Sequence, residues 1–174
     1  MELLSGKDAA EHVAGILHPK YQVHGSSVHL TVRKIYAIDS AGKLDFGGSE
    51  YAPAGRVEVA PHPLRAEDKY LWWDLDRQSY FVVCNETLRL APDQIALVEP
   101  DDRLLRAGGW HIPFFLRGHV DPVELMLVVG VPQLQVKENA RLAHVRLFHV
   151  DDPSKPTRNS HKKSSPKPSR EKRK

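Results

Sequence analysis

The stretch from residue 99 to residue 115 reads EPDDRLLRAGGWHIPFF and places acids, arginines and a Gly-Gly pair between two apolar, strand-like runs. Its aspartates can accept protons or bind cations, and its arginines can hold an anion such as a phosphate. The same residues can also build a polar corner, in which an aspartate caps a turn, an arginine pairs with it and the glycines adopt unusual φ values. Both interpretations rest on Asp101, Asp102, Arg103, Arg106 and Gly108-Gly109.

Histidines and tryptophans are the next candidates for chemistry. Imidazole can ligate metals or transfer protons, and such a role could fall to His29, His111, His119 and His144. No H-x-H or H-x-x-x-H spacing links any two of these four, so the pattern favours surface or interface histidines and no metal site. Trp72-Trp73 predicts one ring facing inward and one outward, and core or interface packing is favoured there over ligand stacking.

Charge is unevenly distributed along the 174 residues. From Asp151 onward, nine Lys/Arg stand against three Asp/Glu, so this end has a charge of +6. Residues 1–150 have a charge of 16 − 19 = −3, and the whole chain therefore has a net charge of +3. The end is rich in Pro, Ser, Lys and Arg and has no large apolar residue, so we expect a disordered basic tail over 151–174 behind one domain over 1–150. Such a tail could contact nucleic acid through charge alone, although a solvating role is more common.

Cys84 is the single cysteine, which excludes an intramolecular disulfide and a Cys-rich zinc site. We see no leader-like N-terminus and no apolar run near the roughly 20 residues needed to cross a bilayer. These features predict a soluble, cytoplasmic protein without a membrane partner.

The elements that must position these side chains are mainly strands. Ser5 and Asp8 indicate the start of a helix that continues with helical spacing to Leu17 and is ended by Pro19. The stretch SVHLTVRKIYAI over 27–38 then alternates apolar and polar residues, as a half-buried strand does. Many short strand-like runs separated by turn residues follow, which predicts a mainly β sandwich or barrel with a short N-terminal helix.

Four stretches, in order, resemble the dCTP deaminase/dUTPase superfamily: GSSVHLTV, SYFVVCNETLRLAPDQIALVEP, PDDRLLRAGGWHI and ENARLAHVRLF. The resemblance covers most of residues 1–150. It implies a dUTPase-like distorted β-barrel or jelly roll, a homotrimer with nucleotide sites between subunits, and Mg²⁺ held through nucleotide phosphates. It also implies dCTP deamination or cleavage of dUTP to dUMP and pyrophosphate.

The resemblance also implies which residues form the site. The family's Arg-Ser-Ser positions read Asp101, Asp102 and Arg103, His29 stands where an aspartate is expected, and Leu116 falls at the position of the acid that orients water. Two carboxylates near a phosphate are repulsive, so we expect a weakened or inactive enzyme. If activity remains, the implied catalytic residues are Glu124 and Asp102 or Asp101, and the implied nucleotide-binding residues are Ser26, Ser27, His29, Arg103, Arg106, Gly118 and His144.

A different class of function stays open from the sequence. The chain could be a non-catalytic trimeric binding or scaffold protein whose basic tail reaches a nucleic acid or an acidic partner. Binding to nucleic acid that is salt-sensitive, requires the tail and is unaffected by deoxynucleotides would favour this hypothesis over a nucleotide enzyme.

Overall fold

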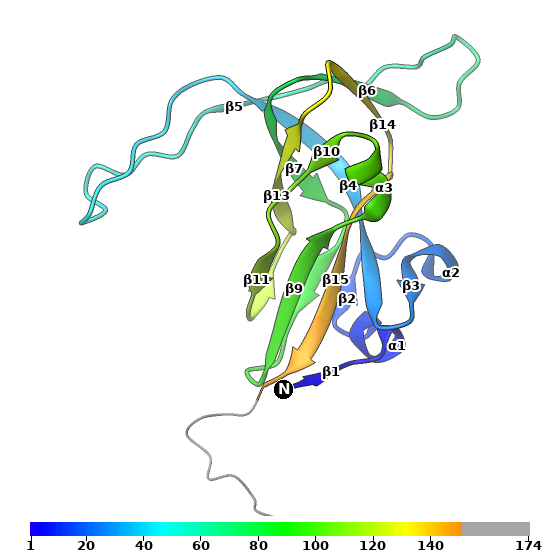
Figure 1. Cartoon of the computed structure of the whole chain (residues 1–174), viewed down its shortest axis with the longest axis vertical. Helices are drawn as coiled ribbons and strands as arrows, with labels where there is room; N and C mark the ends of the chain where they lie inside the picture. The colour runs from blue at the N-terminus through cyan, green and yellow to red at the C-terminus, as the bar shows by residue number, and fades with distance from the viewer. Residues whose placement is uncertain (151–174) are drawn as a thin grey trace, which may run out of the picture.

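The computed structural model describes residues 1–150, so the predicted basic tail lies outside the described residues. The fold is mainly β, as predicted, and is built on a curled sheet in the order β10-β13-β7-β4-β15-β9-β11 (Figure 1). The strands on this path are β4 (Ser27–Ile38), β7 (Ser79–Cys84), β9 (Gln94–Pro100), β10 (Gly109–Trp110), β11 (Phe114–Leu116), β13 (Glu124–Val129) and β15 (Arg141–His149).

Shorter strands extend this sheet or form two small sheets beside it. Strand β1 (Glu2–Leu3) pairs with β15, and β3 (Val23–His24) and β5 (Arg56–Glu58) pair with β4. The small sheets contain β2 (Val13–Ala14), β8 (Thr87–Arg89) and β12 (His119–Val120), and separately β6 (Trp72–Asp76) and β14 (Gln133–Lys137). The helices are α1 (Gly6–Ala10), α2 (Pro19–Gln22) and α3 (Asp102–Arg106), and none of those described is long enough to cross a membrane.

Strand β4 has the predicted bounds, residues 27–38, and the predicted alternation holds from Ser27 to Leu30 but fails at Thr31, which is also buried. Val28, Leu30 and Val32 are fully buried, and Arg33 and Lys34 are exposed. A register shift against β7 between Val32 and Lys34 then returns Ile35 to the core. The strand pairs with β7 on one side and β15 on the other, so both of its ends are fixed by neighbours far away in the sequence.

The N-terminal helix is shorter than predicted. Ser5 caps α1 as expected, because its Oγ accepts a hydrogen bond from the Asp8 backbone N–H at 3.2 Å. The helix ends at Ala10, however, because Val13–Ala14 pair with β8 instead of continuing the turn. Pro19 begins α2, where its missing N–H costs nothing, so the prediction that it ends a long helix is wrong.

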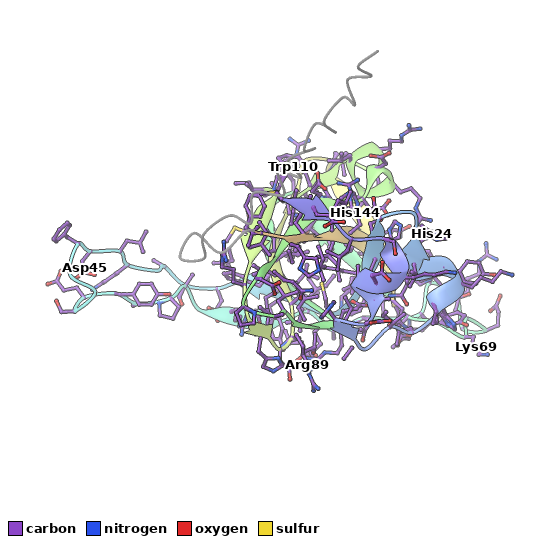
Figure 2. The ribbon with its side chains drawn as sticks, turned by 90° about the horizontal axis from the view of Figure 1, so that it is seen from below. His24, Asp45, Lys69, Arg89, Trp110 and His144 are labelled. Atoms are coloured by element: carbon purple, nitrogen blue, oxygen red, sulfur yellow. The ribbon has the colours of Figure 1, made fainter. Side chains whose placement is uncertain are left out.

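Two segments leave the body of the sheet. The connection from β4 to β5, residues 39–55, and the connection from β5 to β6, residues 59–71, extend in opposite directions (Figure 1). The labelled residues Asp45 and Lys69 lie at the two outer ends of the molecule (Figure 2). The first segment carries exposed Leu44 and Phe46. The molecule therefore combines a packed sheet with two projecting arms.

A buried carboxylate fixes the start of β4. Glu86 is fully buried and accepts hydrogen bonds from Gln22 Nε2 at 2.7 Å, from the Thr31 backbone N–H at 2.8 Å and from Thr31 Oγ1 at 2.7 Å. Burial raises the pKa of Glu86, and these hydrogen bonds act in the opposite direction. Gln22 also donates to the His29 carbonyl at 3.0 Å. Glu86 thus ties α2 to the strand that carries His29.

Candidate functional site

Three segments meet beside the start of β4 and line an open pocket of about 340 Å³. The register of the sheet causes the meeting, because His144 of β15 lies opposite His29 of β4 on one side and opposite Glu99 of β9 on the other. Helix α3 follows β9 directly and adds its first residues. We call the lining residues the histidine–arginine cluster; they are Ser27, His29, Asp101, Asp102, Arg103, Arg141, His144 and Arg146.

Asp101 holds this corner together. It is 4% exposed and caps α3, with Oδ1 accepting from the Arg103 backbone N–H at 2.9 Å. Its Oδ2 lies 2.9 Å from His29 Nδ1, and because an ionised carboxylate only accepts, His29 must donate. Burial acts to raise the pKa of Asp101, but the Arg103 N–H and charge together with His29 lower it below its ordinary value. The predicted polar corner is thus confirmed for Asp101 and Arg103.

The histidines of this region are held neutral. Burial is the largest cause that lowers the pKa of His29, His111 and His144, and nearby Asp101 raises it in part for His29 and His144. The His29 and His144 rings lie 6.0 Å apart. Among the described residues, Nε2 of His111 and of His144 has no hydrogen-bond partner, although His144 Nε2 lies 3.4 Å from Glu99 Oε2. A buried imidazole nitrogen without a partner is a group that a ligand can satisfy.

Arginines supply the positive charge of the cluster. Arg103 has a side chain that is 62% exposed, with Nε 3.5 Å from Asp101 Oδ1, so most of its guanidinium donors face solvent. Arg141 donates from Nη1 to the Tyr21 carbonyl at 2.6 Å, and Arg146 pairs with Glu99. The doubled aspartate is therefore less repulsive to an anion than the sequence suggested, because Asp101 is turned inward and already bonded. The cluster can bind an anion, and neutral histidines beside it can accept protons.

Glu124, which was expected to be catalytic, does not line the histidine–arginine cluster. Glu124 lies on β13 opposite Val83 of β7. Val83 pairs in turn with Lys34 of β4, and Lys34 is five residues along that strand from His29. Five residues of strand span about 16 Å. Glu124 pairs with Arg56 at 3.1 Å and helps to line a separate cavity of about 610 Å³ beneath the arm of residues 39–55. We call this the Glu124 cavity; its lining also includes Phe81, Tyr51 and Leu44.

Three other residues expected to bind nucleotide do not line the histidine–arginine cluster. Arg106 is exposed at the end of α3, and Ser26 precedes Ser27 in the turn before β4. Gly118 has φ +67° between β11 and β12, and its carbonyl accepts from the Leu90 N–H at 3.0 Å. The structure therefore brings together Ser27, His29, Asp102, Arg103 and His144, and leaves Glu124, Ser26, Arg106 and Gly118 outside.

Sequence reasoning missed two arginines and the inward turn of Asp101. Arg146 could have been found, because it is two residues after His144 and a strand repeats its facing every two residues. Arg141 could not, because the pairing of β15 with β4 shifts register between Arg141 and Ala143. Among the described residues, no group of three or more His, Cys, Asp or Glu side chains is placed to hold a metal ion.

Two proteins of known sequence that resemble this chain have the same name. The chain is 28% identical over 132 residues to a probable deoxyuridine 5'-triphosphate nucleotidohydrolase of Methanosarcina acetivorans, covering 75% of this chain and 74% of that protein. It is 29% identical to the protein of the same name from Methanosarcina mazei, again over 132 residues, with the same coverage. No family model matches the sequence.

A solved structure resembles the fold. The 2'-deoxycytidine 5'-triphosphate deaminase of Agrobacterium tumefaciens superposes with a TM-score of 0.60 at 17% identity, over 84% of this chain. The matched region covers 47% of the deaminase, so this chain corresponds to about half of that protein. At this identity the likeness concerns the fold alone.

Proposed function

This chain is related to the dCTP deaminase/dUTPase superfamily, and from that premise we propose that it binds a deoxynucleoside triphosphate at the histidine–arginine cluster, with dUTP as the first candidate. One observation carries the proposal: Ser27, His29, Arg103 and His144 come from three of the four family-like stretches and line one cavity. The two relatives named as probable dUTP nucleotidohydrolases favour dUTP over dCTP.

Phosphate binding would rest on Arg103. Its guanidinium is largely exposed and presents several N–H donors in a planar fork that suits phosphate oxygens. The Ser27 hydroxyl and the imidazole of His144 would add hydrogen bonds, each from its own strand. A Mg²⁺ ion would be held mainly by the phosphates, as Mg²⁺ usually is, and exposed Asp102 is the carboxylate that fits as its protein contact.

Hydrolysis would be weak in an isolated chain. Cleavage of dUTP to dUMP and pyrophosphate needs a base beside the attacking water, and Asp101 is already committed to His29 and the Arg103 N–H. Leu116 stands at the position of the family's water-orienting acid and has no proton acceptor. Glu124 is displaced from His29 by about five residues along the strand direction, roughly 16 Å. A glutamate at the site would therefore have to come from a neighbouring protomer of a homotrimer. Catalysis is therefore proposed to be reduced, with binding retained.

The test is a thermal-shift and calorimetric titration of dUTP, dCTP, dTTP and ribonucleotides, with and without Mg²⁺, followed by product analysis. A ligand at 100 times its dissociation constant adds about 2.7 kcal/mol of stability. We expect dUTP to stabilise the wild type and Arg103→Ala to lose at least tenfold in affinity.

The matched control is Arg106→Ala, on the same helix and also exposed but outside the cluster. The sequence resemblance gives both arginines a role, whereas the geometry favours Arg103. Equal losses in the two variants would overturn the placement of the phosphates. No binding of any deoxynucleotide, together with salt-sensitive binding of nucleic acid that requires residues 151–174, would favour the scaffold function instead.

A further inference from the structure

Asp101 and His29 form a bonded pair on the wall of the histidine–arginine cluster, and we call this pair the Asp101–His29 dyad. His29 Nδ1 lies 2.9 Å from Asp101 Oδ2, while Oδ1 of the same carboxylate accepts from the Arg103 backbone N–H. Because an ionised carboxylate has no proton to give, the imidazole carries its proton on Nδ1. The lone pair of neutral His29 therefore lies on Nε2, on the side of the ring away from the carboxylate.

Nε2 of His29 is free to accept a proton from a ligand. The His29 side chain is 18% exposed and lines the open pocket, and within residues 1–150 no group forms a hydrogen bond with its Nε2. Burial is the largest cause that lowers the pKa of His29, so the neutral form predominates near pH 7. A carboxylate that fixes the tautomer of a neutral imidazole is the arrangement that makes histidine a general base in hydrolytic triads.

Asp101 also holds a phosphate-binding group beside His29. Arg103 Nε lies 3.5 Å from Asp101 Oδ1, whereas His29 is bonded to Oδ2, so a single carboxylate contacts both the guanidinium and the imidazole. Both side chains line the same pocket. A phosphoryl group bound to Arg103 would therefore lie in one pocket with a neutral imidazole, which is what attack by water on phosphorus requires.

The other two buried imidazoles of this region are less suited to the role of base. His144 lines the same pocket, but its Nε2 is buried and faces Glu99 Oε2 at 3.4 Å, which favours a proton on that nitrogen. His111 does not line the pocket, and its Nε2 is also buried. Of these three histidines, only His29 combines a carboxylate at hydrogen-bonding distance with a place on the pocket wall.

We propose that His29 is the general base of a slow hydrolysis of the bound deoxynucleoside triphosphate, and that Asp101 is the residue that positions it. This inference rests on the proposed function and deepens it, because it supplies the base that Leu116 and Glu124 do not provide. A water molecule would give one proton to His29 Nε2 as its oxygen forms a bond to the α-phosphorus. The bond from that phosphorus to the oxygen bridging to the β-phosphorus would break with its electron pair. Pyrophosphate would leave, dUMP would remain, and His29 would return its proton to solvent.

The experiment measures dUTP affinity and the single-turnover rate of dUMP formation in the same variants. General-base catalysis contributes about 10²–10⁴-fold, so His29→Ala should lose at least about a hundredfold in rate while its affinity changes less than about threefold. Added imidazole should restore part of that rate, because it can occupy the space of the missing ring. The matched control is His24→Ala, since the His24 ring lies 5.6 Å from that of His29 but outside the pocket lining, and it should match the wild type.

Asp101→Asn tests the positioning role without removing the cap of α3. The amide oxygen can still accept from the Arg103 N–H, whereas the amide nitrogen would donate to His29 Nδ1 and move the imidazole proton to Nε2. We expect the rate to fall by about a hundredfold or more, because the lone pair then points away from the pocket. Affinity for dUTP and the thermal unfolding temperature should stay close to those of the wild type.

The pH profile is a readout that a merely structural dyad would not move. The charged and titratable groups facing His29 are Asp101, Arg141, His144 and His24. The wild-type kcat/KM should rise with pH as His29 loses its proton, through a value below the ordinary 6.5, and then level off. In Asp101→Asn the rise should move to lower pH, because the carboxylate that raises the His29 pKa is gone.

Two results would overturn the dyad as a base while leaving the binding site in place. One is a wild type that binds dUTP but forms no dUMP. The other is a His29→Ala variant that keeps the wild-type rate, or that loses rate and affinity equally without rescue by imidazole. If the wild type binds no deoxynucleotide, the proposed function falls and this inference falls with it.

Discussion

The histidine–arginine cluster and the Glu124 cavity are two polar regions of the molecule that differ in how deeply their charged groups are buried. In the cluster, a carboxylate that is 4% exposed is bonded to a histidine and a backbone N–H, and burial lowers the pKa of both histidines, His29 and His144. In the Glu124 cavity, Arg56 and Glu124 form an ion pair in which both side chains are 42% exposed. Burying polar groups is costly unless they are paired, whereas an exposed pair contributes little.

The difference lies in what holds each arrangement in place. A costly arrangement persists when the surrounding structure enforces it, and Asp101 and His29 are enforced by α3, β4 and β15 together. The Glu124 pair joins β13 to β5 at the surface, beside the arm over residues 39–55, in which the Lys43 N–H donates to the Ala52 carbonyl at 2.8 Å.

The largest effect is expected from Asp101→Ala compared with Glu124→Ala in urea unfolding. Asp101→Ala removes the cap of α3, worth about 1 kcal/mol, and leaves the His29 Nδ1–H without its acceptor, worth about 1–3 kcal/mol. We expect a loss of about 2–4 kcal/mol for Asp101→Ala and less than about 1 kcal/mol for Glu124→Ala. Asp102→Ala is the control, because Asp102 is the exposed neighbour of Asp101. Similar losses in all three variants would remove the contrast.

The sequence predicted the fold well wherever a local pattern and the tertiary structure agree. Strand β4 has the bounds that its alternation indicated, and Ser5 caps α1. The N-terminal helix failed because helical spacing cannot reveal that Val13 and Ala14 pair with β8, a strand more than seventy residues away in the chain. Local periodicity gives the type of an element, and long-range pairing decides where it ends.

The candidate site was predictable in its membership but not in its geometry. Ser27, His29, Arg103 and His144 were expected together and line one cavity. The inward turn of Asp101, which reduces its repulsion of an anion, could not be predicted from the sequence. It depends on a hydrogen bond between Asp101, at the start of α3, and His29 of β4, which are far apart in the chain. The separation of Glu124 also depends on strand order, which places β7 between β13 and β4.

An intermediate effect is expected from pH. His29, His111 and His144 have lowered pKa values in the folded chain, so below their ordinary pKa of about 6.5 the unfolded chain takes up more protons. The free energy of unfolding should therefore fall as pH drops from 7 to 5, by up to about 1.4 kcal/mol per pH unit for each such proton. Glu86 acts in the opposite sense at the acidic end, because its raised pKa makes the folded chain take up its proton first.

His144→Gln isolates one part of this dependence. Glutamine keeps a polar side chain at position 144, and it cannot gain a charge. The groups around His144 include Glu99, Asp101, Asp102 and Arg146, and they remain in the variant. We expect a shallower decline between pH 7 and 5 and parallel curves between pH 7.5 and 8.5. An unchanged slope would show that burial of His144 does not contribute to acid sensitivity.

The smallest effect is expected in the Glu124 cavity, from a double-mutant cycle on Arg56 and Glu124. The pair is separated by 3.1 Å but is half exposed, and the Arg56 guanidinium also lies 5.0 Å from the Tyr36 ring centroid, so single variants mix an ion pair with a ring contact. The cycle removes the ring term, and its coupling should be below about 1 kcal/mol. It should shrink further in 1 M salt, where the Debye length is about 3 Å.

A coupling above about 2 kcal/mol that salt does not reduce would contradict the contrast, because only a desolvated pair behaves in that way. Protein concentration then distinguishes two causes. If the coupling grows with concentration, a neighbouring protomer covers the Glu124 cavity, and the glutamate becomes available to a nucleotide held on another chain. If the coupling is independent of concentration, the arm over residues 39–55 shields the pair within one chain, and Glu124 belongs to a site separate from the histidine–arginine cluster.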